Sequence, residues 1–166
     1  MPNSHITLEL PHLNTPDYSD RLRIRQTADK ATIWDPLRSK WVALTPEEWI
    51  RQNVTLYIAD TLQVSTNLMA HETEIIYNGM SRRCDAVIYA PDGSPLIVVE
   101  YKQHRIPLAQ HVFDQAVLYC MHLNVPYLIV SNGLQHLLCQ IDKTNRRYIF
   151  AQTWPTYTEL LKQTEN

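Results

Sequence analysis

The pattern of apolar and polar positions along the chain predicts strands interrupted by three helices. Alternating or continuous apolar stretches predict strands over residues 21–25, 32–34, 41–44, 68–76, 85–90, 95–102, 125–130, 135–141 and 148–151. Apolar residues at helical spacing predict helices over about residues 45–61, 107–122 and 156–162. Residues 1–20 show no clear period and are expected to form an extended arm of a single domain, residues 1–166. This mixed order of elements predicts an α/β or α+β fold with a mixed β-sheet.

The start of the first predicted helix carries two acids, and its apolar positions indicate which one faces inward. Residues 50, 54 and 58 define a buried stripe by their i, i+4 spacing, and Glu47 lies on that stripe one turn before Ile50. Glu48 is rotated by about 100° around the helix axis. We therefore expect Glu47 to face inward. Such an acid can serve as a partner of the helix dipole, or as a third carboxylate beside other acids.

Two apolar runs on either side of Asp92-Gly93 predict a β-hairpin. A two-residue turn would pair Val87 with Val98 and would place Asp85 directly opposite Glu100, with Lys102 further along the same face. Facing cross-strand residues have Cβ atoms about 5 Å apart, and two buried carboxylates at that spacing need a partner. Oxygen ligands in this arrangement suit Mg²⁺ or Mn²⁺. The alternative is a strand end in water, with Lys102 bridging the acids, and a slip of one residue would separate them onto opposite faces.

Composition and charge narrow the classes of function. The 15 Lys and Arg residues against 17 Asp and Glu residues give a net charge of −2, which excludes a strongly basic nucleic-acid coat but not a local basic patch. The 3 glycines form neither G-x-G-x-x-G nor a P-loop. Cys84, Cys120 and Cys139 lie far apart, which argues against a zinc ribbon or a disulfide framework. With neither a signal-peptide pattern nor a long apolar run, we expect a cytoplasmic protein without membrane contact.

Basic and aromatic residues outside the hairpin have two interpretations. Arg21, Arg23 and Arg25 share one face of a predicted strand, where they could follow phosphates or could simply form a solvated, edge-guarding face. The four tryptophans, among them Trp34 and Trp41, are expected to be core or lid residues rather than platforms for stacked bases.

The acids and the lysine also carry a family resemblance. Glu47 on a first helix, Asp85 before a hairpin and Glu100-Tyr101-Lys102 on its second strand resemble the PD-(D/E)XK nuclease pattern. Residues 40–150 are similar, more specifically, to the N-terminal nuclease-like domain of type I restriction enzyme R subunits, in segments 44–52, 83–87, 95–102, 112–115 and 126–133. The resemblance implies an α/β, restriction-endonuclease-like fold in which a mixed central β-sheet is flanked by helices.

The resemblance further implies a role for each of these residues. Asp85 and Glu100 would hold Mg²⁺ or Mn²⁺ with the backbone carbonyl of Tyr101, and Lys102 would orient and help to deprotonate the attacking water. Glu47 would be an auxiliary metal ligand and Gln115 a supporting polar residue on the next helix. Cys84 stands where the proline of the family name would be.

The expected function is metal-dependent hydrolysis of phosphodiesters in nucleic acid. DNA is the expected substrate, and the expected partners are a restriction system or further copies of the chain. The alternative is a non-catalytic module on the same fold that binds nucleic acid or protein.

Overall fold

The computed structural model describes residues 8–165, which form two β-sheets, three α-helices and one short 3-10 helix. The elements in chain order are β1 (Ile24–Gln26), β2 (Ala31–Asp35), β3 (Lys40–Ala43), α1 (Pro46–Leu62), η1 (Thr66–Leu68), β4 (Met69–Tyr77), β5 (Met80–Tyr89), β6 (Pro95–Tyr101), α2 (Gln110–His122), β7 (Tyr127–Ser131), β8 (His136–Asp142), β9 (Arg147–Phe150) and α3 (Tyr157–Thr164). No helix within residues 8–165 has the length and apolar character needed to span a bilayer.

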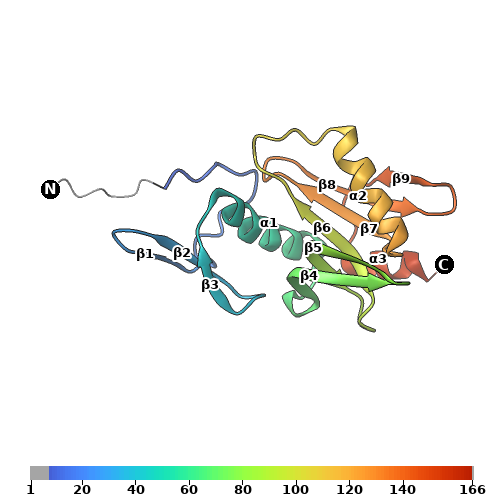
Figure 1. The fold of residues 1–166 in the computed structure, drawn as a ribbon, viewed down its shortest axis with the longest axis horizontal. Coiled ribbons are helices and arrows are strands. Elements are labelled where there is room, and N and C mark those ends of the chain that lie inside the picture. The colour runs from blue at the N-terminus through green and yellow to red at the C-terminus, as the bar shows by residue number, and fades with distance from the viewer. Residues whose placement is uncertain (1–7, 166) are drawn as a thin grey trace.

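The larger sheet has the strand order β4-β5-β6-β7-β8-β9 and is covered on both faces (Figure 1). Its neighbouring strands are antiparallel except β6 and β7, which run parallel because α2 connects them as a crossover. Ala86 and Val99 pack on the side of α1 and α3, whereas Val87 and Val98 pack on the side of α2. The predicted mixed sheet flanked by helices is therefore confirmed, with the predicted hairpin at its centre.

The β5–β6 hairpin reaches the predicted register by an unpredicted route. The expected two-residue turn is wrong, because Ala90 N–H donates to Ser94 O at 2.8 Å and closes a loop of three residues that ends at Gly93, with φ +84°. This loop pairs Tyr89 with Pro95, one position away from the expected register. A β-bulge after Ile88 inserts one extra residue into β6 and restores the pairing of Val87 with Val98.

Helix α1 begins at the predicted residue, but it buries the other acid. The side chain of Thr45 accepts a hydrogen bond from Glu48 N–H at 3.1 Å, as an N-cap should. Ile50 is buried as expected, but Glu47 is exposed and Glu48 is only 8% exposed, so the prediction of an inward-facing Glu47 is wrong. Polar residues on α1, such as Thr55, are also buried, so the buried arc is wider than the apolar stripe.

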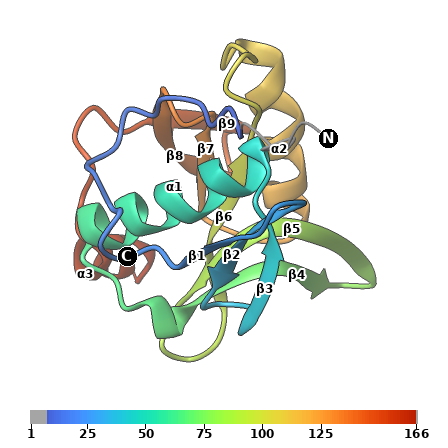
Figure 2. The ribbon, with the colours of Figure 1, turned by 90° about the vertical axis from the view of Figure 1, so that its left-hand side faces the viewer.

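The smaller sheet, β1-β2-β3, lies beside α1 and β4 (Figures 1 and 2). Buried polar contacts join it to both elements: Asp35 pairs with His71 on β4, and Arg38 pairs with Glu48 on α1. Charged groups consequently help to fix this sheet to the rest of the molecule, together with the fully buried Ile33.

The N-terminal arm has no helix or strand between residues 8 and 20, and residues 1–7 of the predicted arm lie outside the described residues. The arm is nevertheless anchored. Leu13 is buried, Asn14 N–H donates to Gly133 O at 2.8 Å, and Trp49 Nε1–H donates to Pro11 O at 3.2 Å. The arm thus closes over the start of α1 and the β7–β8 turn.

Candidate functional site

The acids predicted from the hairpin lie at adjoining ends of β5 and β6. The pairing of these strands ends at Ala86 and Val99, so Asp85 and Glu100 are the next residues beyond it. Asp85 Oδ2 accepts a hydrogen bond from Tyr101 N–H at 2.9 Å, and the carboxylate of Glu100 is largely buried. The structure therefore brings the two predicted acids to the same end of the hairpin.

Lys102 joins them directly after β6 ends. Its Nζ lies 3.2 Å from Glu100 Oε2, and its backbone N–H donates to Ser131 O on β7 at 2.7 Å. This backbone hydrogen bond fixes the position of the Lys102 backbone, from which the side chain extends, against the larger sheet. A half-buried ammonium group thereby lies beside a buried carboxylate.

Arg82 also belongs to this site, as a partner of Glu100 that the sequence did not predict. Its Nη2 donates to Glu100 Oε1 at 2.5 Å, so the Glu100 carboxylate lies between two cations. The guanidinium also lies 3.7 Å from the centre of the Tyr119 ring on α2. This stacking holds Arg82 in place and leaves its charge directed at Glu100.

An irregularity in β5 explains why Arg82 escaped prediction. The β4–β5 ladder pairs His71 with Ala86 and Thr73 with Cys84, but it contains no pair between Glu72 and Asp85, and Glu72 has φ +47°. Ala86 consequently packs on the α1 side while Cys84 packs on the α2 side, although strict alternation would put both on one side. Residues before Asp85 thus reach the face that carries Glu100.

A buried chain of polar groups connects the site to the smaller sheet. His71 Nδ1 lies 2.8 Å from Asp35 Oδ2, His71 Nε2 lies 2.8 Å from Thr55 Oγ1, and the same hydroxyl lies 2.8 Å from the Tyr101 hydroxyl. Burial alone would raise the pKa of Asp35, but the hydrogen bond and charge of His71, with help from Arg38, hold it well below its usual range. Burial raises the pKa of the Tyr101 phenol. These buried hydrogen bonds fix the side chain of Tyr101, the residue between Glu100 and Lys102.

The acid buried on α1 belongs to an ion-pair cluster rather than to the pair of hairpin acids. Glu48 Oε1 accepts from Arg38 at 2.6 Å and from Gln52 at 2.8 Å. Arg51 lies 3.7 Å from Glu48 and 2.9 Å from Glu72 on β4. The hydrogen bond from Arg51 lowers the pKa of Glu72 to about 2.

The two remaining predicted site residues are both exposed. Glu47 projects from the first turn of α1, and Gln115 lies on α2 one turn before Tyr119, the residue that stacks on Arg82. Residues four apart share a helix face, so Gln115 is on the side of α2 that approaches Arg82. Neither residue has a hydrogen bond that ties it to Asp85 or Glu100 within residues 8–165.

The donor set defines the kind of metal that this site could hold. Within the described part of the chain, no three His, Cys, Asp or Glu side chains are arranged to hold a metal ion. A metal site built from Asp85, Glu100 and the Tyr101 carbonyl would therefore have only two carboxylate ligands. Such a set suits Mg²⁺, which keeps several waters and often binds through one or two carboxylates and a substrate phosphate. Arg82 would compete with the ion for Glu100.

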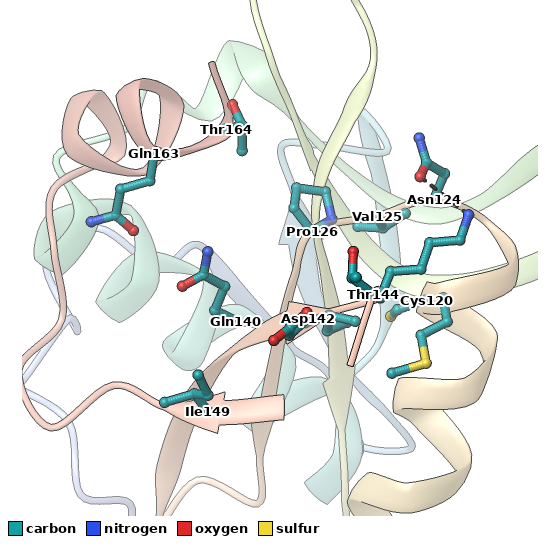
Figure 3. A pocket seen from close by; sticks show the side chains of 13 residues that line it. Cys120, Asn124, Val125, Pro126, Gln140, Asp142, Thr144, Ile149, Gln163 and Thr164 are labelled. Carbon is teal, nitrogen blue, oxygen red and sulfur yellow. Dashed lines mark hydrogen bonds between the residues drawn. The ribbon is translucent and has the colours of Figure 1, made fainter. Parts of the chain in front are cut away.

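A cavity of about 580 Å³ lies near the other end of β7 and contains none of the predicted site residues (Figure 3). It is lined by the end of α2, the start of β7, the end of β8 and the end of α3, including Cys120, Pro126, Gln140 and Gln163. Its carboxylate, Asp142, is already bound by Asn145 and Arg147. This cavity therefore offers no comparable cluster of reactive groups.

Comparisons with known proteins agree with this fold. The family model described as the type I restriction enzyme R protein N terminus (HSDR_N) matches residues 46–155. Among solved structures, the chain is similar to a fragment of a putative HsdR subunit of a type I restriction enzyme from Vibrio vulnificus YJ016, with a TM-score of 0.52 and 22% sequence identity. The match covers 71% of this chain and 25% of that one, so the chain spans about a quarter of the length of that fragment. No curated protein matches the sequence. Since the matched segment covers more than half of the chain and contains α1, the hairpin and α2, the chain belongs to the family of type I restriction enzyme R protein N-terminal domains.

Proposed function

We propose that the chain hydrolyses phosphodiester bonds of DNA in a Mg²⁺-dependent reaction, as part of a restriction system. The observation that carries this proposal is the meeting of Asp85, Glu100 and Lys102 at one end of the β5–β6 hairpin. The membership of the family supports the restriction context. Other subunits of such a system, or a second copy of this chain, are the partners that we propose.

Each residue has a chemical task in this proposal. Asp85, Glu100 and the Tyr101 carbonyl would hold the ion, which when bound polarises a phosphoryl oxygen and lowers the pKa of a bound water. Lys102 lies within reach of the Glu100 carboxylate, where its ammonium group would orient the attacking water and stabilise negative charge on the phosphate. Gln115 would support the site from α2, and Glu47 would act only through water because it is exposed.

A specific contact favours the alternative function, a nucleic-acid-binding module that does not catalyse. Arg82 and Lys102 together already satisfy both oxygens of Glu100. A carboxylate between two cations is stable without a metal ion. The two functions therefore differ in whether an ion can displace Arg82 from Glu100.

Titration calorimetry with Mn²⁺ tests the metal site. We expect binding to the unaltered chain and at least a tenfold weaker affinity in Asp85→Asn and Glu100→Gln, because each variant removes one of two charged ligands. Asp20→Asn, at an exposed acid outside the site, is the matched control and should bind normally. Arg82→Gln should bind Mn²⁺ more tightly, because the competing cation is gone. Equal binding by the unaltered chain and Asp85→Asn would refute the proposed ligands.

Nicking of supercoiled plasmid in Mg²⁺ tests the chemistry. We expect nicking by the unaltered chain and by Lys143→Ala, a control at an exposed lysine, and loss of nicking in Lys102→Ala. A chain that binds DNA and Mn²⁺ but never nicks would favour the alternative function. Nicking that persists in both Asp85→Asn and Lys102→Ala would place the chemistry elsewhere.

A further inference from the structure

The outer face of the smaller sheet carries two arginines over two tryptophans. Trp34 and Trp41 face each other across β2 and β3, with ring centres 5.6 Å apart and an edge-to-face orientation. The backbone carbonyl of Arg23 accepts a hydrogen bond from Trp34 N–H at 2.9 Å, so Arg23 continues the same row across the sheet. Arg25 follows two residues later on the same face. We call these four residues the Arg–Trp face.

The arginines of this face are held by aromatic rings and not by acids. The guanidinium of Arg25 lies 3.8 Å from the centre of the Trp41 ring, and that of Arg23 lies 5.6 Å from Trp34 and 5.7 Å from Trp41. Within residues 8–165 neither Arg23 nor Arg25 forms an ion pair, whereas the neighbouring Arg21 pairs with Asp60 at 2.6 Å. A stacked guanidinium keeps its N–H edges available for an anion. The face is therefore a local excess of positive charge on a chain whose net charge is −2.

The tryptophans of this face do not serve the core. Trp49 and Trp154 pack against the main hydrophobic cluster, as we expected for all four tryptophans. Trp34 and Trp41 belong to neither hydrophobic cluster and remain half-buried. Half-exposed indoles beside exposed arginines need a different explanation from core packing.

The opposite face of the same strands holds the sheet in place. Ile33 is fully buried, and Asp35 is bound to His71 and Arg38. In Figures 1 and 2, β1–β3 form a separate layer beside α1 and β4. The Arg–Trp face is thus presented on a rigid base, and its own side chains are not needed to attach the sheet.

We infer that the Arg–Trp face binds a single strand of nucleic acid. Phosphates would accept from the edges of Arg23 and Arg25, and a base would stack on an indole when a guanidinium moves from the ring to a phosphate. A single strand offers both anions and flat rings, whereas a duplex hides its rings and an acidic peptide has carboxylates alone. The inference goes beyond the proposed hydrolysis and does not depend on it, because it involves neither Asp85 nor Lys102.

Fluorescence anisotropy of labelled dT20, measured in EDTA so that no metal ion contributes, tests the inference. Each single-strand phosphate contact contributes about 0.7 to the slope of log affinity against log salt. Arg23→Gln combined with Arg25→Gln should therefore reduce the slope by about 1.4, and counterion release alone should weaken binding about 10-fold at 0.2 M salt and about 60-fold at 0.05 M salt. Arg146→Gln, at an exposed arginine on the β8–β9 loop, should leave binding unchanged.

A second variant tests the stacking. Trp41→Leu removes the ring but keeps apolar bulk, and it should weaken dT20 at least fivefold, since stacking on an aromatic side chain contributes about 1–3 kcal/mol per base. In the unaltered chain dT20 should quench tryptophan fluorescence, and the quenching should fall in Trp41→Leu. If Trp41→Leu does not fold, the double arginine variant decides alone. Unchanged dT20 binding in the double arginine variant would overturn the inference. It would also be overturned if the unaltered chain bound a 20-base-pair duplex as tightly as dT20, or if polyglutamate competed for the face as well as dT20 does.

Discussion

Replacement of Arg38 by methionine tests whether buried ion pairs fasten the smaller sheet to the rest of the molecule. The Arg38 side chain is 13% exposed, bonds Asp35, and lies 2.6 Å from Glu48 and 3.7 Å from Glu72. Removing one partner of a buried ion pair costs about 3–5 kcal/mol, because the other charge stays buried without compensation. Methionine preserves most of the side-chain volume, so the loss of charge dominates.

The remaining contacts set the expected cost at the lower end of that range. Asp35 keeps His71 and the backbone N–H of Leu37, which donates at 2.8 Å. Glu48 keeps Gln52 and its capping position, but it loses its closest cation. We therefore expect Arg38→Met to lower the free energy of unfolding by about 3 kcal/mol. With a urea slope of about 2 kcal/mol/M, the midpoint of unfolding should fall by about 1.5 M.

The chain offers a matched control for this experiment. Arg21 and Asp60 also lie 2.6 Å apart, but their side chains are 46% and 48% exposed. An exposed pair contributes less than about 1 kcal/mol, so Arg21→Met should shift the midpoint by less than about 0.5 M. Adding Glu48→Gln to Arg38→Met should recover stability, since it removes the uncompensated charge. Urea unfolding followed by circular dichroism checks all three variants, and equal shifts in Arg38→Met and Arg21→Met would refute the reasoning.

Three further predictions concern Glu72, Gly133 and Cys139. Arg51 holds the pKa of Glu72 at about 2, below the usual 4.5. The stability that ionised Glu72 contributes is therefore complete above pH 4.5 and is lost as the pH falls toward 2. Between pH 5 and pH 2 the melting temperature should fall less in Glu72→Gln than in the unaltered chain. Gly133→Ala should destabilise by about 1–3 kcal/mol in urea unfolding, because Gly133 has φ +84° and the new Cβ would lie 2.6 Å from Leu13 Cδ2. Burial raises the pKa of the Cys139 thiol to about 12. A thiol reagent at pH 8 should therefore modify this residue only after urea unfolds the chain. Rapid labelling of Cys139 in the folded chain would contradict its burial.

The sequence alone predicted most of the secondary structure and the central pairing of the hairpin. Helix α1 starts after Thr45 because a capping side chain and a following proline are local signals. The pairing of Val87 with Val98 was predicted by counting back from an assumed two-residue turn at Asp92-Gly93, and the structure has this pairing. The turn has three residues instead of two, and the predicted register is correct only because a β-bulge after Ile88, which was not foreseen, compensates for the longer turn.

The tertiary structure decided which charged groups meet. Glu48 is buried in place of Glu47 because Arg38 approaches α1 from a loop of the smaller sheet, and nothing within the helix encodes that contact. Arg82 reaches Glu100 because β5 loses its alternation at Asp85, opposite a residue with positive φ. The periodicity of a chain reports local geometry and burial, whereas an ion pair depends on which distant segment arrives beside it. The identities of the two hairpin acids were therefore readable from the sequence, but their counter-charges were determined only by the packing of the two sheets, α1 and α2.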